Sequence, residues 1–364
     1  MKLLKYLFLF LVGFTYSQNV TVTADKTTMS EAQTTTFTAT LSATSSDIVT
    51  VNLTLGGTAK EDIDFTTAFT SKVGSTVAGG NGAGSELNKA SGPLGVFVDS
   101  SANIYYAGPT NPRVMKWAPG ASSGTVVAGG NGKGSGLNQF NRINGVTLDS
   151  SGNIYIADYD NHRIMKWEPD ATVGTVVAGG NGAGTGLNQL NPSDVYLDSS
   201  GNIYVVDAGN HRVMKWTPGA TSGTMVAGTG SSGSGDNQLD SPRGIHVDSS
   251  GNIYITDSSN NRVMKWTPGA TSGTVVAGGN GSGSGLNQLA SPSGVSIDSS
   301  GNIYIGDADN HRVMKWAPDA SEGTVVAGGN GQGSGMNQLH NPSGVSVDSS
   351  GNIYVAHVVN HRVM

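Results

Sequence analysis

One pattern of about 50 residues is written six times along this 364-residue chain. Its most constant part, Asn-Ile-Tyr, begins at Asn103, Asn153, Asn202, Asn252, Asn302 and Asn352, so successive copies lie 50, 49, 50, 50 and 50 residues apart. A single repeat of this kind cannot bury its apolar face alone, and stacked neighbours share one continuous core. The repeat therefore limits the fold to architectures that stack similar units.

The second unit shows what each copy contains. Four short runs, residues 145–149, 153–158, 163–167 and 175–178, are rich in β-branched and aromatic residues and are bounded by Gly, Pro, Asn and Asp. The turn "DSSGN" joins the first two runs, and Gly152 can adopt a positive φ there. No segment keeps a 3.6-residue period for three turns, which excludes helical repeats. Four antiparallel strands per unit predict the blades of a β-propeller.

The ends of the repeat array predict how the ring closes. The third-strand motif occurs six times, at Arg113, Arg163, Arg212, Arg262, Arg312 and Arg362. The fourth-strand motif also occurs six times, but its first copy, "GSTVAGG" at residues 74–80, precedes the first blade. A propeller removes its sheet edges by closing on itself, so we expect this segment to complete the sixth blade. The alternative is a truncated product with further blades missing, since the last "RVM" lacks the "KW" of the other copies.

The N-terminus has the pattern of a secretory signal peptide. Two lysines precede an apolar run from Tyr6 to Phe14, followed by small or polar residues, and we expect cleavage after Ser17. The run is too short to span a bilayer comfortably, so we expect a secreted protein without a membrane span, extracellular, at the cell surface or periplasmic. The chain has no cysteine, so its stability must come from core burial rather than disulfides.

Residues 18–71 differ from the repeats. Thr, Val and Leu alternate with period two over short runs, which is typical of an antiparallel sandwich. The stretches "MSEAQTTTFTATLS" and "GTAKEDIDF" resemble the first half of a Calx-beta domain. Glu31, Asp62 and Asp64 stand where such domains can carry calcium ligands, but with half the sheet missing we interpret them as a solvated acidic turn. We therefore divide the chain into a signal peptide (1–17), a partial Calx-beta-like segment (18–71) and the repeat domain (72–364).

The repeats resemble a known family. "NHRVMKW" and "GVSIDSSGNIYIGDADNHRVMKW" are similar to the blades of NHL-repeat propellers, in particular bacterial ones, over about residues 72–364. The resemblance implies an all-β, six-bladed propeller of four-stranded blades. Propellers of this kind host protein binding, RNA binding and a few enzymes, so the fold does not settle the function. With a net charge of −6 and no basic face, we do not expect nucleic acid as a partner.

The loop after each second strand supplies the first candidate site. In a four-stranded blade this loop and the inter-blade loop share one face, so the "ADYDNHR" loops predict a binding rim. Packed sheets lie about 10 Å apart, whereas metal–nitrogen bonds are about 2 Å, so histidines of different blades cannot share one ion. We therefore expect no metal, and within each blade we expect a structural hydrogen bond from the carboxylate to the imidazole or to loop amides. The candidate rim residues are Asp158, Tyr159, Asp160, His162, Arg163, Asp207, His211, Arg212, Asp257, Arg262, Asp307, Asp309, His311, Arg312, His246 and His340.

Positions that differ between the copies are a second set of candidate site residues. Six near-identical units offer no asymmetric catalytic site, so a site is better sought where the copies differ. On the expected rim and near it these positions are Tyr159, Asp160, Ala208, Gly209, Ser258, Ser259, Asp309, Thr110, Val358, Val359, Lys133, Arg142, Arg243, His246 and His340. The five tryptophans all end the third strand, which indicates packing between blades rather than a sugar platform.

These patterns favour a monomeric binding or adhesion module that recognises a protein or a carbohydrate. The glycine-rich loops are not followed by a helix that could hold a phosphate, and we expect no cofactor and no catalysis. The alternative is a lyase or hydrolase with a metal in the central channel, for which His246 or His340 would be the candidates. A purely structural surface protein, or a fragment without a function of its own, is the remaining interpretation.

Overall fold

The computed structural model describes residues 6–10, 20–24, 37–41, 52–56 and 73–364, and the chain divides into two units, Met1–Val73 and Gly74–Met364. In the first unit β1 (Tyr6–Phe10) pairs antiparallel with β4 (Asn52–Gly56), and β2 (Val20–Ala24) pairs antiparallel with β3 (Phe37–Leu41). The expected cleavage point and the acidic residues Glu31, Asp62 and Asp64 lie outside the described residues, so both stay predictions. In the part of the chain that the structure describes, no helix is long and apolar enough to cross a membrane.

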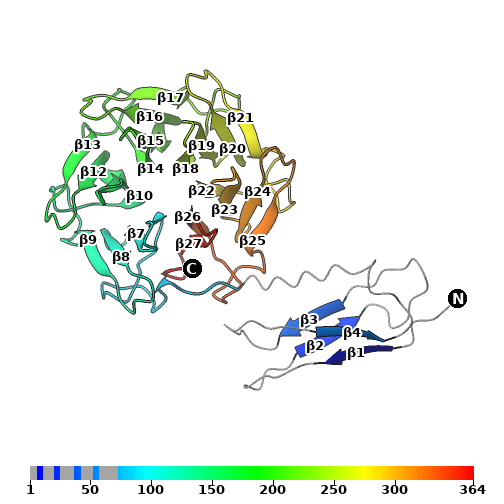
Figure 1. Cartoon of the computed structure of the whole chain (residues 1–364). Helices are drawn as coiled ribbons and strands as arrows, with labels where there is room; N and C mark the ends of the chain where they lie inside the picture. Colours follow the sequence, from blue (N-terminus) through cyan, green and yellow to red (C-terminus); the bar gives the residue numbers. More distant parts are fainter. Residues whose placement is uncertain (1–5, 11–19, 25–36, 42–51, 57–72) are drawn as a thin grey trace. The chain divides into compact units, whose positions relative to one another are not determined.

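Residues 73–364 form six four-stranded antiparallel sheets, the blades, arranged in a ring (Figure 1). Blade one holds β6 (Val96–Val98), β7 (Ile104–Gly108), β8 (Arg113–Trp117) and β9 (Thr125–Gly129). Blade two holds β10 (Ile143–Leu148), β11 (Ile154–Asp158), β12 (Arg163–Trp167) and β13 (Thr175–Gly179). Blade three holds β14 (Pro192–Leu197), β15 (Ile203–Asp207), β16 (Arg212–Trp216) and β17 (Thr224–Gly228). Short 3₁₀ turns, η1 (Tyr159–Asn161) and η2 (Ala208–Asn210), follow the second strands of blades two and three.

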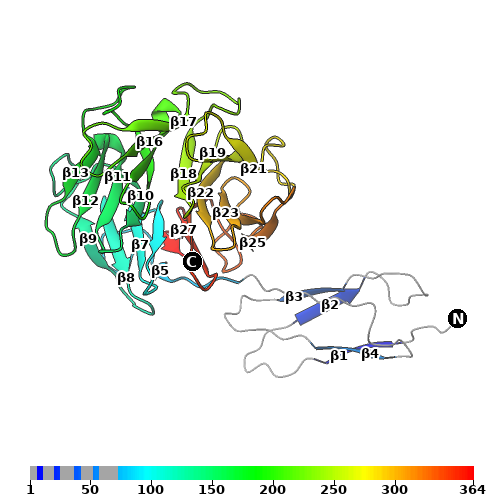
Figure 2. The same ribbon diagram turned by 45° about the horizontal axis from the view of Figure 1, so that its top comes forward.

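The remaining blades repeat the same order. Blade four holds β18 (Pro242–Val247), β19 (Ile253–Asp257), β20 (Arg262–Trp266) and β21 (Thr274–Gly278). Blade five holds β22 (Pro292–Ile297), β23 (Ile303–Asp307), β24 (Arg312–Trp316) and β25 (Thr324–Gly328). Blade six holds β26 (Pro342–Val347), β27 (Ile353–His357), β28 (Arg362–Val363) and β5 (Ala78–Gly79). In each blade the first strand, such as β10, β18 or β22, lies nearest the centre of the ring (Figure 2). The predicted all-β, six-bladed propeller is confirmed.

The ring closes between the two ends of the repeat array. Strand β5 pairs antiparallel with β28, with Ala78 opposite Val363. The N–H of Val77 donates to the carbonyl of Val363 (2.9 Å), and the N–H of Gly80 donates to that of His361 (3.0 Å). The predicted N-terminal closing strand is therefore present, and it removes the sheet edge that β28 would otherwise expose.

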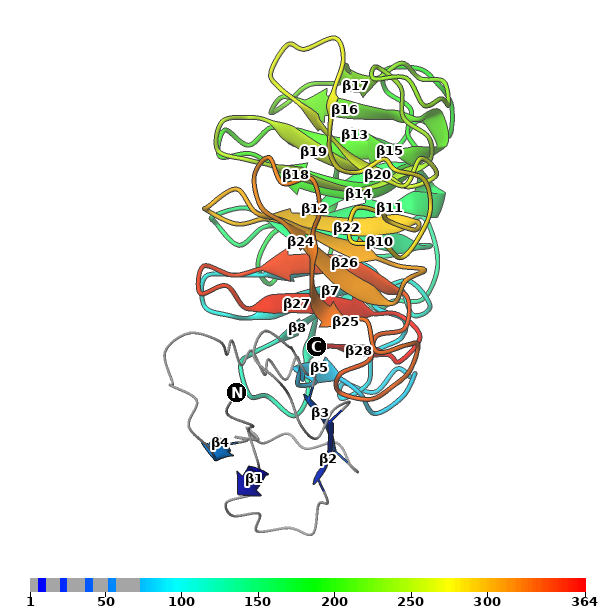
Figure 3. The ribbon, with the colours of Figure 1, turned by 90° about the vertical axis from the view of Figure 1, so that its right-hand side faces the viewer.

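The core lies between the blades, whose sheets stack face to face (Figure 3). In one cluster Tyr105 and Val114 of blade one pack with Ile156, Met165 and Trp167 of blade two. The five tryptophans are at most 3% exposed, which confirms their predicted packing role. Each buries a large apolar area between two blades, so packing between neighbouring blades contributes to the stability of the propeller.

Candidate functional site at the mouth of the central channel

The aspartates and arginines of the predicted rim are buried. Four aspartates are 0% exposed and four arginines 5–6%: Asp158, Asp207, Asp257, Asp307, Arg163, Arg212, Arg262 and Arg312. Each pair closes the hairpin between the second and third strands, because the aspartate ends one strand and the arginine, directly opposite, begins the next. These side chains stabilise the blades from inside and are out of reach of a ligand at the surface.

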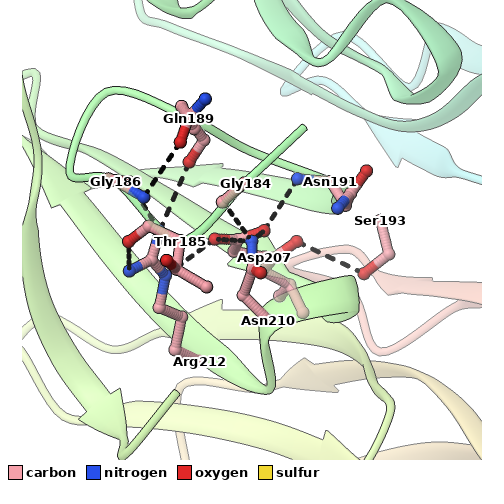
Figure 4. A network of polar contacts seen from close by, with 10 residues as sticks. Gly184, Thr185, Gly186, Gln189, Asn191, Ser193, Asp207, Asn210 and Arg212 are labelled. Carbon is pink, nitrogen blue, oxygen red and sulfur yellow. Dashed lines mark hydrogen bonds and ion pairs between the residues drawn. The ribbon is translucent and has the colours of Figure 1, made fainter. Parts of the chain in front are cut away.

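Blade three shows how the pair works (Figure 4). Asp207 Oδ2 accepts hydrogen bonds from Arg212 Nε (2.7 Å) and from Asn210 Nδ2 (2.9 Å), and Asp207 Oδ1 accepts one from the backbone N–H of Asn191 (2.7 Å). The guanidinium also donates to the carbonyls of Thr185 and Gly186 in the inter-blade loop, both at 2.8 Å. The network therefore fastens the inter-blade loop onto the hairpin.

The carboxylates of this network hold loop amides, as expected, but their charged partner is the guanidinium and not the imidazole. In blades two and five, burial raises the pKa of Asp158 and Asp307, while hydrogen bonds from asparagine, backbone and arginine oppose that rise. A buried carboxylate is tolerated because each is paired and hydrogen-bonded. The expected carboxylate–imidazole contact within a blade is thus replaced by a carboxylate–guanidinium pair.

The histidines of these loops join neighbouring blades. His211 Nδ1 accepts a hydrogen bond from the backbone N–H of Ser241 in blade four (3.1 Å). His311 Nδ1 accepts one from the N–H of Asn341 in blade six (3.3 Å). All these histidines adopt the left-handed conformation, with φ of 51° at His211 and 55° at His311. His211 and His311 thus make contacts between blades.

Blade three departs from this arrangement. In blade four Ser241 stands between the end of the inter-blade loop and the proline that begins β18, whereas in blade three Pro192 follows Asn191 directly and no residue corresponds to Ser241. The backbone N–H that the histidine of blade two would bind is therefore missing. Accordingly, His162 Nδ1 is buried without a hydrogen-bond partner among the described residues. The single 49-residue spacing in the sequence marks this irregularity.

A cavity of ≈ 490 Å³ lies at the centre of the ring. Its lining comes from the first residues of the inner strands and from the loops after the second strands of blades two and three, so it opens on the face that carries those loops. The charged and polar residues that distinguish its wall are Arg142, Asn144, Tyr159, Asp194, His211 and Arg243. Its volume falls within the range of small-ligand sites.

One position at the start of the inner strand lines this cavity in all six blades. Five blades carry glycine, at Gly95, Gly145, Gly244, Gly294 and Gly344, and blade three carries Asp194. A Cβ at Gly294 would lie 2.5 Å from the carbonyl oxygen of Ser343, so neighbouring inner strands approach too closely for a side chain there. In blade one the lining residues are Leu94 and Gly95. Asp194 is therefore the exception in a ring of glycines.

Asp194 is held by two backbone groups. Its Oδ1 accepts a hydrogen bond from the N–H of Val195 (2.9 Å), and its Oδ2 accepts one from the N–H of Ile245 in blade four (3.1 Å). The side chain keeps some access to solvent through the cavity, but protein surrounds it closely. This burial raises the pKa of Asp194 to about 7, although both hydrogen bonds lower it. A carboxyl group that titrates near neutral pH inside a cavity is typical of a functional position.

Two arginines stand at the same cavity. Arg142 is exposed, and its guanidinium lies over the ring of Tyr159, 5.0 Å from the ring centre, in cation–π geometry. Arg243 on blade four is exposed as well. No described residue accepts a hydrogen bond from either guanidinium. Both cations are therefore free to bind an anionic group.

The remaining predicted rim residues are spread more widely. Tyr159 and His211 line the cavity, whereas Asp160 and Asp309 are exposed outside its lining. Asp309 Oδ2 accepts a hydrogen bond from the hydroxyl of Ser291 (2.6 Å). The accessible part of the predicted rim that shares one cavity is thus confined to blades two and three.

His246 and His340 do not come together. His246 packs on Tyr196 with ring centres 4.7 Å apart, and burial lowers its pKa to about 4. His340 lies beside Gln332, with 2.7 Å between His340 Nε2 and Gln332 Nε2, and near the ring of His311. Neither histidine lines the cavity, and within the described residues no group of three His, Cys, Asp or Glu side chains could hold a metal ion.

Sequence reasoning missed Asp194. The search for positions that differ between copies included Arg142, Tyr159, Ala208, Gly209 and Arg243, all of which line the cavity. It stopped at the loops and did not compare the inner strands. Aligning the six first strands would have shown one aspartate among five glycines, within three residues of the deletion that shortens the same unit.

Comparisons with known proteins agree with this fold. The NHL repeat model matches residues 140–167, 190–216, 239–266 and 289–316. Among solved structures, a protein of unknown function from Bacteroides thetaiotaomicron is 19% identical with a TM-score of 0.61, over 79% of this chain and 74% of that one. A gluconolactonase from Xanthomonas campestris is 14% identical with a TM-score of 0.56, over 76% and 86%.

An auxiliary nutrient binding protein from Bacteroides ovatus is 15% identical with a TM-score of 0.55, over 76% of this chain and 69% of that one. At such identities these likenesses show the fold alone. A search of curated proteins found no match. The four matched repeats lie in blades two to five, and the remaining two blades have the same strand order. The chain therefore contains four NHL repeats, and its blades close into a six-bladed β-propeller.

Proposed function

We propose that this propeller is a binding module whose ligand occupies the mouth of the central channel over blades two to four. One observation carries the proposal: Asp194 projects a carboxyl group into the cavity at a position where five other blades use glycine. The fold does not need this side chain, since the same strand forms five times without it. A carboxyl group in the wall of a cavity that the fold does not require is best explained by recognition.

The surroundings of Asp194 support recognition rather than catalysis. Arg142 and Arg243 add two cations to the same cavity, and both are free of protein partners among the described residues. The alternative of a metal-dependent lyase or hydrolase named His246 or His340 as its candidate, and neither lines the cavity. The apolar run at the N-terminus favours export, so we propose that the module acts outside the cytoplasm, as a monomer, on a carbohydrate or protein of that compartment.

The chain itself supplies a variant that removes the site. Inserting Ser between Asn191 and Pro192 and changing Asp194→Gly gives blade three the local sequence pattern of blade five, so the strand should fold as it does there. Wild type and variant are immobilised and presented with a glycan array and with culture-medium proteins. We expect the wild type to retain a ligand that the variant loses, while thermal unfolding shows that the variant is folded.

Asp160→Ser is the matched control, because Asp160 is an exposed carboxylate on the neighbouring blade two that does not line the cavity. It should bind like the wild type. Equal binding by the wild type and the blade-three variant would show that the cavity is not the site. If folded wild type retained neither a glycan nor a protein, the binding proposal would be wrong.

A further inference from the structure

The cavity is lined by more basic than acidic side chains, although the chain as a whole is acidic. The protein has 26 acidic and 20 basic residues apart from histidine, a net charge of −6. Yet the cavity is lined by two arginines and one carboxyl group, Arg142, Arg243 and Asp194. A guanidinium presents a rigid fork of donors that matches a carboxylate, and Tyr159 already orients that of Arg142. The mouth of the cavity is therefore suited to one carboxylate.

The wall of the cavity also carries hydrogen-bond acceptors. Ser193 and Ser293 line it, and each hydroxyl donates a hydrogen bond to a carbonyl of the next blade. Ser193 donates to the carbonyl of Arg243 (3.0 Å), and Ser293 donates to that of Pro342 (2.7 Å). Each serine oxygen also has lone pairs that these donated hydrogen bonds do not use. Asp194 uses one hydrogen bond per carboxyl oxygen, which leaves further lone pairs. A ligand that fits this wall must bring several donors, and neutral hydroxyl groups supply them without adding charge.

From these two features we infer that the cavity binds a sugar acid, that is a polyhydroxylated ligand with one carboxylate, such as a uronic acid residue. The inference rests on the proposed binding function and names its ligand class. The carboxylate pairs with Arg142 and Arg243, and the hydroxyls donate to Asp194 and the serines. The volume of ≈ 490 Å³ suits a single sugar unit of this kind. The unit could be a free sugar acid or a residue of an acidic polysaccharide.

The test measures binding of galacturonate, of trigalacturonate and of the matched neutral sugars galactose and galactotriose to the full chain by calorimetry. Arg142→Ser and Arg243→Ser are the site variants, because other blades carry serine at both corresponding positions, at Ser241 and Ser293. Lys133→Ser is the matched control: it also removes one exposed cation, it lies outside the cavity, and blade four carries Ser232 there.

We expect an acidic sugar to bind, the neutral sugar to bind at least tenfold more weakly, and each arginine variant to lose about tenfold or more in affinity, since each removes a charge-assisted pair. The control should bind like the wild type. Binding of galacturonate itself would identify a free sugar acid, and binding of the trisaccharide alone a polysaccharide.

Two results would overturn the inference. Neutral sugars that bind as tightly as acidic ones, with no effect of the arginine variants, would leave the binding function standing but remove its acidic ligand. Failure of all four sugars to bind folded protein would also refute the sugar acid, and the separate retention of culture-medium proteins decides whether the binding function falls with it.

Discussion

Among single residues, Asp207 and its counterparts are those on which the blades most depend. Each is buried, and each is the charged partner of a buried arginine. Asp207→Asn would leave the guanidinium of Arg212 buried without a counter-ion, so we expect the free energy of unfolding to fall by about 3–5 kcal/mol. Urea denaturation measures it. Asp160→Asn, an exposed control, should change it by less than about 0.5 kcal/mol. A loss below about 1 kcal/mol for Asp207→Asn would show that the pair contributes little.

Asp194, in contrast to Asp207, lowers the stability of the folded protein at neutral pH. Its pKa is raised to about 7 in the folded protein, above 3.8 for the free group, so the folded state binds the proton more tightly. The stability that this proton binding contributes to the folded state is therefore fully present below about pH 4 and is lost as the pH rises toward 7. Asp194→Gly removes this loss, so we expect the variant to gain stability relative to wild type between pH 4 and 8, by at most about 4 kcal/mol. Urea denaturation at several pH values measures the difference. A constant difference across that range would contradict the raised pKa.

At the scale of elements, the two blades at the closure lack the aspartate that serves blades two to five. Blade one has Gly108 there, and blade six has His357, which is buried and accepts a hydrogen bond from Arg362 Nε (3.2 Å). Burial, helped by the positive charge of Arg362, lowers the pKa of His357 to about 3. The histidine therefore stays neutral in the folded ring.

His357 should make the closure sensitive to acid. Below pH 6.5 the unfolded chain takes up a proton at this residue that the folded chain excludes until about pH 3. Stability should therefore fall as pH drops through this window, by about 1.4 kcal/mol per pH unit. His357→Asp restores the pairing of the other blades and should remove this part of the acid loss, as measured by thermal unfolding between pH 3.5 and 7. The same acid sensitivity in wild type and variant would rule out His357 as its cause.

The elements also show what the sequence can predict. The third strand of blade two, β12, has the predicted bounds, because its apolar pattern and flanking residues define both ends. The first strand, β10, starts two residues earlier than predicted, since a bulge between Ile143 and Val146 lets the strand continue past the pattern. The inter-blade loop folds back so that Lys133 bridges to Phe140, and this covers the hairpin. Periodicity carries no information on such folding back, so Asp158 and Arg163 were expected on the surface.

The sequence could likewise predict some residues of the candidate site but not how they are brought together. Arg142 and Arg243 could be singled out because they break a pattern that the other copies keep. That both arginines line the same cavity as Asp194 depends on how closely the inner strands converge at the centre of the ring. That convergence is set by glycines, and the effect of replacing one of them is visible only in three dimensions.

For the whole molecule, the decisive contact is the pairing of β5 with β28. Ala78 belongs to the core cluster that joins blade one to blade six, together with Tyr106, Met115 and Val363. Removing β5 would expose this cluster and leave β28 with an open edge. We therefore expect a chain of residues 81–364 to unfold at least about 10 °C below a chain of residues 73–364, or without a cooperative transition.

A peptide of residues 74–80 separates loss of the closing strand from general damage to the shortened chain. Added to residues 81–364, it should pair with β28 and raise the unfolding temperature with increasing concentration, because it binds only the folded ring. A scrambled peptide of the same composition should have no effect. If the two chains unfold alike, the blades hold together without β5, and the stability of the propeller comes from stacking between the other blades rather than from closure of the ring.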